Sequence, residues 1–287
     1  MKIAVCGKGG SGKSTVLALL AKELAKKYSV LVLDIDESNY GLHSKLGLAA
    51  PRDLLEYFGG KQGFKEKQNM PKPLALEGLN GLGKGVAFPG HLQQELQQPQ
   101  NQKLQQPQNQ KQPEAPFEKR WSLSEIPAGF VVEKSGIKLM AIGKIQEFGE
   151  GCACPMGSLT RKFFENLDLE KDEFVLVDTS AGVEHFGRGI DSYFDLILVV
   201  VDPSYESLNL AGKFEELGRQ AGNKVYFVLN RAETDVKGEM LAAVEVSKVA
   251  AVIPVNRELF KASLRGEETD IELEEVSGLA EFLGTGI

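Results

Sequence analysis

A glycine-rich loop near the start of the chain contains the residue types that bind phosphate. It follows an apolar run, Ile3–Cys6, and precedes an amphipathic stretch, so it lies at the strand-to-helix junction that such a loop requires. Glycines let backbone N–H groups turn inward around phosphate oxygens, and the helix dipole adds positive potential there. We therefore expect a P-loop for ATP or ADP, in which Lys13 reaches the β- and γ-phosphates and Ser14 binds Mg²⁺. The residues of this predicted phosphate site are Gly7, Lys8, Gly9, Gly10, Ser11, Gly12, Lys13, Ser14 and Thr15.

Three acids lie at the ends of predicted strands. Asp34 and Asp36 lie at the end of the predicted strand Val30–Ile35, and strand alternation points both toward one face at the carboxyl end of the sheet, where ligands bind in open α/β folds. Asp178 ends the apolar run Phe174–Val177, which is the pattern of a carboxylate that holds Mg²⁺ through a coordinated water. Hydrolysis also needs a carboxylate or amide to orient the attacking water. We therefore expect a Mg²⁺-dependent site at this edge.

Two of the three cysteines form a Cys152-Ala153-Cys154 pair. Three cysteines are too few for a disulfide framework, so the pair indicates a metal or redox site. One chain offers only two thiolates where tetrahedral zinc or square-planar nickel prefers four ligands, and a symmetric dimer would supply the others. Two buried structural cysteines are the alternative. Cys6 is predicted to be a small core residue.

The elements that must position these residues alternate between strands and helices. Continuous Val, Ile and Leu runs indicate a parallel sheet covered by helices on both faces, which is an α/β fold. Residues 130–144 contain two extended runs around Ser135-Gly136 and predict a hairpin. The predicted strands are Ile3–Cys6, Val30–Ile35, Phe174–Val177, Leu196–Val201, Val225–Leu229 and Ala250–Ile253.

A stretch rich in Gly, Pro and Gln, residues 61–127, interrupts this rhythm. It contains the octapeptide LQQPQNQK twice, at Leu96–Lys103 and Leu104–Lys111, and this unit is too short and polar to bury a face by stacking. We predict one P-loop domain, residues 1–287, with a flexible low-complexity insertion at 61–127 that is not part of the core. A dedicated interaction segment is the alternative.

The composition is that of a globular protein, with 42% apolar and 25% charged residues. A formal charge of −7 argues against a general nucleic-acid or anionic-lipid surface, because such surfaces need clustered Lys and Arg. The chain opens directly as a predicted strand without a secretory signal, and no apolar run reaches membrane-spanning length. We expect a cytoplasmic protein that binds neither nucleic acid nor membrane.

The sequence resembles the deviant Walker A family that includes MinD, ParA, the nitrogenase iron protein and nickel-insertion ATPases. Lys8 inside the loop carries this resemblance, together with the A-G-x-E-H run within Thr179–Arg188, which is similar to the switch II segment of nickel-insertion ATPases. Phe148–Gly157 closely resembles the C-x-C region of CooC-type ATPases, and Arg52–Gly60 is also similar. His185 has no Cys or His at ligand spacing, so we expect a structural or switch contact there.

The resemblance implies a P-loop fold of the MinD and iron-protein type and assigns roles to particular residues. Lys8 would cross a dimer interface to the partner's nucleotide, and Asp36 would orient the attacking water. The purine contacts would fall on Asn230 and on the turn formed by Pro254, Val255 and Asn256.

The implied function is slow ATP hydrolysis coupled to nickel insertion into carbon monoxide dehydrogenase. ATP and Mg²⁺ would close a homodimer, and Cys152 and Cys154 of both protomers would surround one Ni²⁺ or Zn²⁺ ion. The partners are then a second copy and a client nickel enzyme.

Two rival functions stay open. The first is an electron-transfer ATPase like the iron protein, which draws its cluster cysteines from two separate segments, whereas here both lie in one. The second is a positioning ATPase of the MinD or ParA kind, and MinD-like proteins end in a basic amphipathic helix, whereas this chain has the acidic run Asp270–Val276 near its end.

Overall fold

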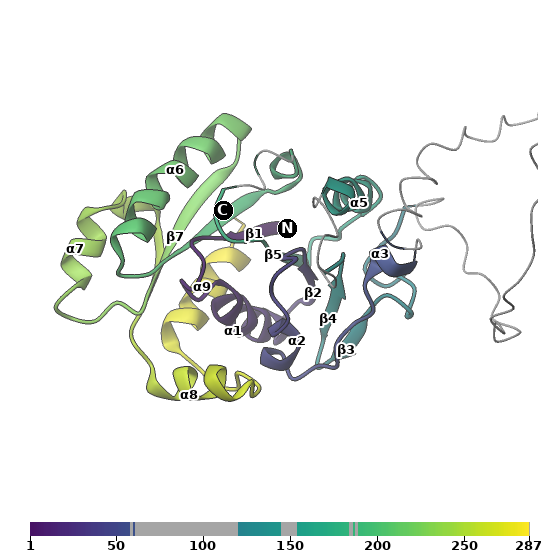
Figure 1. Cartoon of the computed structure of the whole chain (residues 1–287), viewed down its shortest axis with the longest axis horizontal. Helices are drawn as coiled ribbons and strands as arrows, with labels where there is room; N and C mark the ends of the chain where they lie inside the picture. The colour runs from purple at the N-terminus through teal and green to yellow at the C-terminus, as the bar shows by residue number, and fades with distance from the viewer. Residues whose placement is uncertain (58–59, 61–119, 145–153, 184–185, 187–188, 287) are drawn as a thin grey trace, which may run out of the picture.

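A computed structural model describes residues 1–57, 60, 120–144, 154–183, 186 and 189–286 (Figure 1). Its described strands form one eight-stranded sheet with the order β3-β4-β2-β5-β1-β6-β7-β8. All neighbouring strands are parallel except β3 and β4, which are antiparallel. The mostly parallel α/β fold predicted from the sequence is confirmed. The strands are β1 (Lys2–Cys6), β2 (Ser29–Asp34), β3 (Val132–Lys134), β4 (Ile137–Ala141), β5 (Glu173–Asp178), β6 (Leu196–Val201), β7 (Lys224–Asn230) and β8 (Val249–Ile253).

Helices cover both faces of this sheet. One face packs against α5, α6 and α7, and the other packs against α1, α2 and α9 (Figure 1). In the described part of the chain, no helix has the length and apolar character needed to cross a membrane. The helices are α1 (Lys13–Ala25), α2 (Leu42–Lys45), α3 (Leu54–Tyr57), α5 (Cys154–Glu165), α6 (Tyr205–Ala221), α7 (Lys237–Ala242), α8 (Arg257–Arg265) and α9 (Glu274–Gly284), with 3₁₀ turns at Asp191–Tyr193 and Val246–Lys248.

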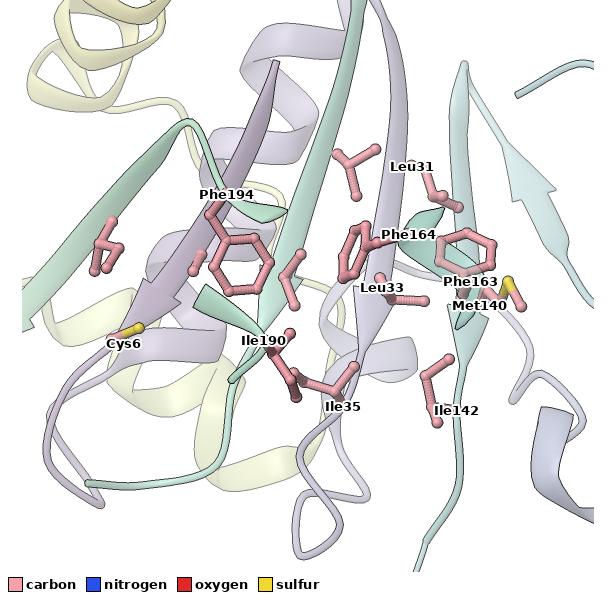
Figure 2. Packing of buried hydrophobic residues seen from close by; sticks show 14 of the residues in the cluster. Cys6, Leu31, Leu33, Ile35, Met140, Ile142, Phe163, Phe164, Ile190 and Phe194 are labelled. Atoms are coloured by element: carbon pink, nitrogen blue, oxygen red, sulfur yellow. The ribbon is translucent and has the colours of Figure 1, made fainter. Parts of the chain in front are cut away.

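Helix α5, which starts at Cys154, is anchored to the sheet by aromatic side chains. Figure 2 shows Phe163 and Phe164 lying over the strand residues Leu31 and Leu33. The Phe164 ring also meets Phe194 edge to face, with ring centroids 5.5 Å apart. Edge-to-face pairs of this kind add to the energy of apolar burial. The helix that begins at the second cysteine of the pair is therefore firmly packed against the sheet.

The predicted hairpin is confirmed at Ser135 and Gly136, whose φ angles are 52° and 80°. Two consecutive positive φ values are the geometry that joins antiparallel strands through a two-residue turn. The second strand, β4, then pairs with β2 so that Ala141 lies opposite Asp34. This register brings the chain beyond β4 to the carboxyl end of β2.

The C-terminal end of the predicted insertion needs correction. Trp121, Leu123 and Ile126 are 4%, 2% and 6% exposed and belong to the core. The Trp121 ring stacks on Phe130 with centroids 6.3 Å apart, and the Trp121 backbone N–H donates to the carbonyl of Asn166 at 2.7 Å. Residues 120–127 are thus part of the domain. The prediction was wrong there because three apolar side chains directly after a long Gln- and Pro-rich stretch do not form a pattern of their own. Residues 61–119, which include both repeats, lie outside the described residues.

Candidate nucleotide-binding site

The predicted P-loop connects β1 to α1 and has the backbone shape that the glycines permit. Gly7, Gly10 and Gly12 have φ angles of 143°, 84° and 98°. A Cβ atom on Gly7 would lie 2.4 Å from the carbonyl oxygen of Val200, so a side chain cannot be accommodated there. Lys13 is buried, and its Nζ donates to the carbonyl of Lys8 at 3.3 Å across the loop. The loop therefore makes a tight turn directly before the N-terminus of α1, which is the arrangement that a phosphate site requires.

Three side chains from separate parts of the sequence meet beside this loop. The Ser14 hydroxyl donates to Oδ2 of Asp178 at 2.7 Å. The amide nitrogen Nδ2 of Asn39 lies 2.7 Å from Ser14 Oγ and 2.9 Å from the same Asp178 oxygen. The N–H of Gly41 donates to Oδ1 of Asn39 at 3.0 Å, which fixes the orientation of this amide. The structure brings together the predicted Ser14 and Asp178, and it adds Asn39, which the sequence reasoning did not assign.

This cluster has the chemistry of a Mg²⁺ site. Burial raises the pKa of Asp178 to about 6, partly offset by its hydrogen bond from Ser14. Its second oxygen, Oδ1, is buried without a hydrogen-bond partner in the described part of the chain. A buried carboxylate oxygen without a partner is costly, and Mg²⁺ with its waters prefers such hard oxygen ligands. The residues present therefore fit a magnesium ion.

The acids at the end of β2 are both buried but have different surroundings. Asp34 Oδ2 accepts from Nζ of Lys144 at 2.6 Å. Burial raises the pKa of Asp34 to about 7, and the nearby Lys144 ammonium opposes this shift. Asp36 Oδ1 instead accepts from the backbone N–H and the hydroxyl of Ser38, at 3.0 and 2.7 Å. Lys144 is a second residue that the sequence reasoning missed.

The predicted base contacts lie around one cavity of about 380 Å³ between the P-loop and α8. Asn230 ends β7, and its Nδ2 donates to the carbonyl of Ser11 at 2.8 Å. The Asn256 side chain caps α8 and accepts from the backbone N–H groups of Glu258 and Leu259. Phe260, which is 67% exposed, lines the cavity too, although the sequence reasoning did not single it out. The sequence-predicted residues on the cavity wall are Gly12, Thr15, Asn230, Pro254, Val255 and Asn256.

Lys8 lies on the open side of the loop. Its Nζ is 3.7 Å from a carboxylate oxygen of Glu206, the second residue of α6, and the two side chains are 26% and 71% exposed. An exposed ion pair at this distance contributes little to stability. The Lys8 ammonium is therefore held only loosely within its own chain.

The predicted metal-binding cysteines cannot be placed in this geometry. Cys152, the side chain of Cys154 and His185 lie outside what the structure describes. Within the described residues, no group of three or more His, Cys, Asp or Glu side chains could hold a metal ion. Cys6 is fully buried in the core as predicted, and burial raises the pKa of its thiol to about 12.

Comparison with known proteins agrees with this geometry. The family described as "CbiA: CobQ/CobB/MinD/ParA nucleotide binding domain" matches residues 2–269. An uncharacterized ATP-binding protein of Methanocaldococcus jannaschii is 44% identical over 284 residues, which is 99% of each chain. The carbon monoxide dehydrogenase accessory protein CooC of Rhodospirillum rubrum is 29% identical over 248 residues, which is 81% of this chain and 80% of that protein.

A solved structure shows the same fold. The septum site-determining protein MinD of Pyrococcus horikoshii, in complex with Mg-ADP, superimposes with a TM-score of 0.61, covering 98% of this chain and 94% of that one at 16% identity. At this identity the likeness concerns the fold alone. The family match spans most of the chain, and the structure supplies the P-loop geometry. The protein therefore belongs to the CobQ/CobB/MinD/ParA family of P-loop nucleotide-binding proteins.

Proposed function

We propose that this protein hydrolyses ATP and uses the cycle to load nickel into a client metalloenzyme, with carbon monoxide dehydrogenase as the first candidate client. The observation that carries the ATPase part is the Ser14–Asp178 contact of 2.7 Å beside the P-loop, with a buried Asp178 oxygen left unpartnered in the described part of the chain. The metal part is supported by the Cys152-Ala-Cys154 sequence and by the similarity to CooC over 81% of the chain.

The residues of this chain divide the work of hydrolysis between them. Lys13 and the N–H groups of the P-loop bind the phosphates. Ser14 and Asp178 would hold Mg²⁺, and the bound ion would supply positive charge to the phosphate oxygens. Asp36 orients the attacking water from its buried position at the end of β2.

A homodimer completes the proposed site for the metal cargo. Within the part of the chain that the structure describes, the Lys8 ammonium pairs only with Glu206, at 3.7 Å, so it is available to reach the nucleotide of a second protomer. Two protomers together supply four thiolates from Cys152 and Cys154, which is the number that nickel or zinc prefers. Thiolates accept both ions, so the nickel assignment follows the resemblance to CooC rather than ligand chemistry.

The packing of α9 argues against a role for this helix as a membrane anchor. This helix buries Val276, Leu279, Ala280 and Leu283 in the layer that contains α1, so its apolar face is already covered by the domain. An interfacial membrane helix needs that face free. Sedimentation with anionic vesicles and ATP tests this alternative, and visible absorbance from an iron–sulfur cluster tests the electron-transfer one.

The proposal is tested by measuring metal content and mass in solution, with Ni²⁺ and ATP present. The variants are the double substitution Cys152→Ala/Cys154→Ala and the matched control Cys6→Ala, which removes a thiol from the core. We expect native protein and the control to form a dimer with one metal ion, and the double variant to keep nucleotide binding but lose the metal. Equal metal binding by all three proteins would refute the cysteine assignment, and only the ATPase proposal would survive.

A further inference from the structure

The Lys144 side chain reaches the end of β2 from beyond β4 and controls the backbone of Asp36. Its Nζ donates to the carbonyl oxygen of Asp36 at 2.6 Å and to Oδ2 of Asp34 at 2.6 Å. The other oxygen of Asp34, Oδ1, accepts the backbone N–H of Asp36 at 3.1 Å. Both polar backbone groups of Asp36 are therefore bonded to the Lys144–Asp34 ion pair. With Oδ1 of Asp36 bonded to Ser38, the carboxylate of Asp36 is held in one orientation.

The base of the Lys144 side chain is itself fixed. The N–H of Lys144 donates to Oδ2 of Asp53 at 3.0 Å. A Cβ atom on the preceding Gly143 would lie 3.1 Å from the sulfur of Met156 and 3.2 Å from Cβ of Leu55, so the backbone there lies close against α3 and α5. A lysine attached to an anchored backbone acts as a rigid support for the groups at its tip.

Stability alone does not account for this arrangement. The Lys144 and Asp34 side chains are only 10% and 7% exposed. Removing two charges from water costs free energy that their attraction often fails to recover, and apolar replacements of similar volume are frequently neutral or stabilising. What the Lys144–Asp34 pair does provide is a fixed position for Asp36. The Lys144 ammonium also places a positive charge close to Asp34, which interacts electrostatically with Asp36 and Asp178.

We propose that Lys144 is a positioning residue for ATP hydrolysis, which holds the Asp34–Asp36 turn so that the Asp36 carboxylate meets the attacking water. This inference rests on the proposed ATPase function and names a further residue of the same site. Lys144 acts through Asp34 and Asp36 and does not itself touch the nucleotide. Its loss is expected to lower kcat and to leave nucleotide binding nearly unchanged.

The first test is steady-state ATPase kinetics with Lys144→Met, Lys144→Arg and Asp34→Asn. Lys138→Met is the matched control, because Lys138 lies on β4 and its Nζ donates to the Leu123 carbonyl, away from Asp36. Misplacing a reacting group by about 1 Å costs on the order of 100-fold, so we expect this fall in kcat for Lys144→Met. KM is expected to change by less than about 3-fold.

Charge rescue and coupling separate positioning from a general structural effect. Lys144→Arg keeps a positive charge and N–H donors, so its kcat is expected to exceed that of Lys144→Met by about 10-fold. Lys144→Met and Asp34→Asn together are expected to cost no more than the more damaging single change, because the two residues act as a unit. A raised KM with unchanged kcat, or losses that simply multiply, would overturn the inference.

A second measurement does not depend on turnover. Hydrogen exchange of the Asp36 amide reports the bond from its N–H to Asp34. We expect exchange at this amide to be at least about 10-fold faster in Lys144→Met and unchanged in Lys138→Met. If wild-type protein hydrolyses no ATP, the proposed function fails, and the exchange result alone then decides whether Lys144 positions this turn. Equal protection of the Asp36 amide in wild type and Lys144→Met would refute the inference.

Discussion

Asn39 contacts both side chains that we assign to Mg²⁺, Ser14 and Asp178. Its Nδ2 contacts both Ser14 Oγ and Asp178 Oδ2, and its Oδ1 is fixed by the Gly41 N–H. We predict that Mg²⁺ binding breaks these contacts, because the Ser14 hydroxyl then turns toward the ion. On this prediction, the Asn39→Ala variant removes contacts that the Mg²⁺-bound protein no longer makes.

The size of the effect follows from these contacts. A hydrogen bond to a charged group contributes about 1.5–3 kcal/mol and a neutral one about 0.5–1.5 kcal/mol. Because Asn39 is half-buried, we expect Asn39→Ala to lower the free energy of unfolding of the nucleotide-free protein by about 2 kcal/mol. If the Mg²⁺·ADP complex lacks these bonds, the substitution costs that complex nothing, and the thermodynamic cycle then makes Mg²⁺·ADP binding to Asn39→Ala about 30-fold tighter.

Denaturant unfolding, followed through the single tryptophan, Trp121, measures the first quantity, and calorimetric titration with Mg²⁺·ADP measures the second. Asn223→Ala is the matched control, because the Nδ2 of Asn223 also makes two hydrogen bonds, to the carbonyls of Asp191 and Phe194. The control is expected to lose stability and to keep its nucleotide affinity. Weaker Mg²⁺·ADP binding by Asn39→Ala would show that Asn39 belongs to the liganded site, and the reasoning would be wrong.

Three further predictions concern the core, a thiol and pH. Leu123→Ala is expected to lower the free energy of unfolding by about 2–5 kcal/mol in denaturant titrations, and an unchanged value would place residues 120–127 outside the core. Because Cys6 is fully buried and its thiol has a pKa of about 12, a thiol reagent at pH 8 is expected to leave Cys6 unmodified in native protein and to modify it after unfolding, whereas labelling of Cys6 in native protein, mapped by mass spectrometry, would contradict this. Burial raises the pKa of Asp34 to about 7, so its contribution to stability is complete below its unfolded pKa and is lost as pH rises through about 7. Free energies of unfolding at pH 5 and pH 8 check this, and Asp34→Asn is expected to reduce the difference between them.

Local sequence patterns were sufficient for the strands and for the phosphate loop. Leu196–Val201 is apolar throughout and is buried throughout, because helices cover both faces of the sheet. The glycines and Lys13 of the P-loop lie within one short segment of the sequence. Their spacing was therefore enough to predict the shape of the loop. Ser135-Gly136 predicted a tight turn for the same reason.

The features that the sequence did not reveal depend on contacts between distant segments. Lys144 meets Asp34 because β4 pairs with β2 in a register that places Ala141 opposite Asp34, and nothing near Lys144 in the sequence indicates that register. Asn39 follows Asp36 by three residues, yet its role depends on Ser14 and on the end of β5. Residues 120–127 were misassigned because their burial depends on α5 and on the strands beneath it.

The strand order explains why this site forms from residues so far apart. β5 lies between β2 and β1, so Asp178 at its carboxyl end stands between the acids that follow β2 and the P-loop that follows β1. One buried carboxylate can therefore contact Ser14 and Asn39 at once. A change in the charge at Asp178 must then reach both the phosphate loop and the Asp34–Asp36 turn. The nucleotide site and the turn that Lys144 holds are therefore linked through one buried carboxylate, which bonds to Ser14 and interacts electrostatically with Asp34 and Asp36.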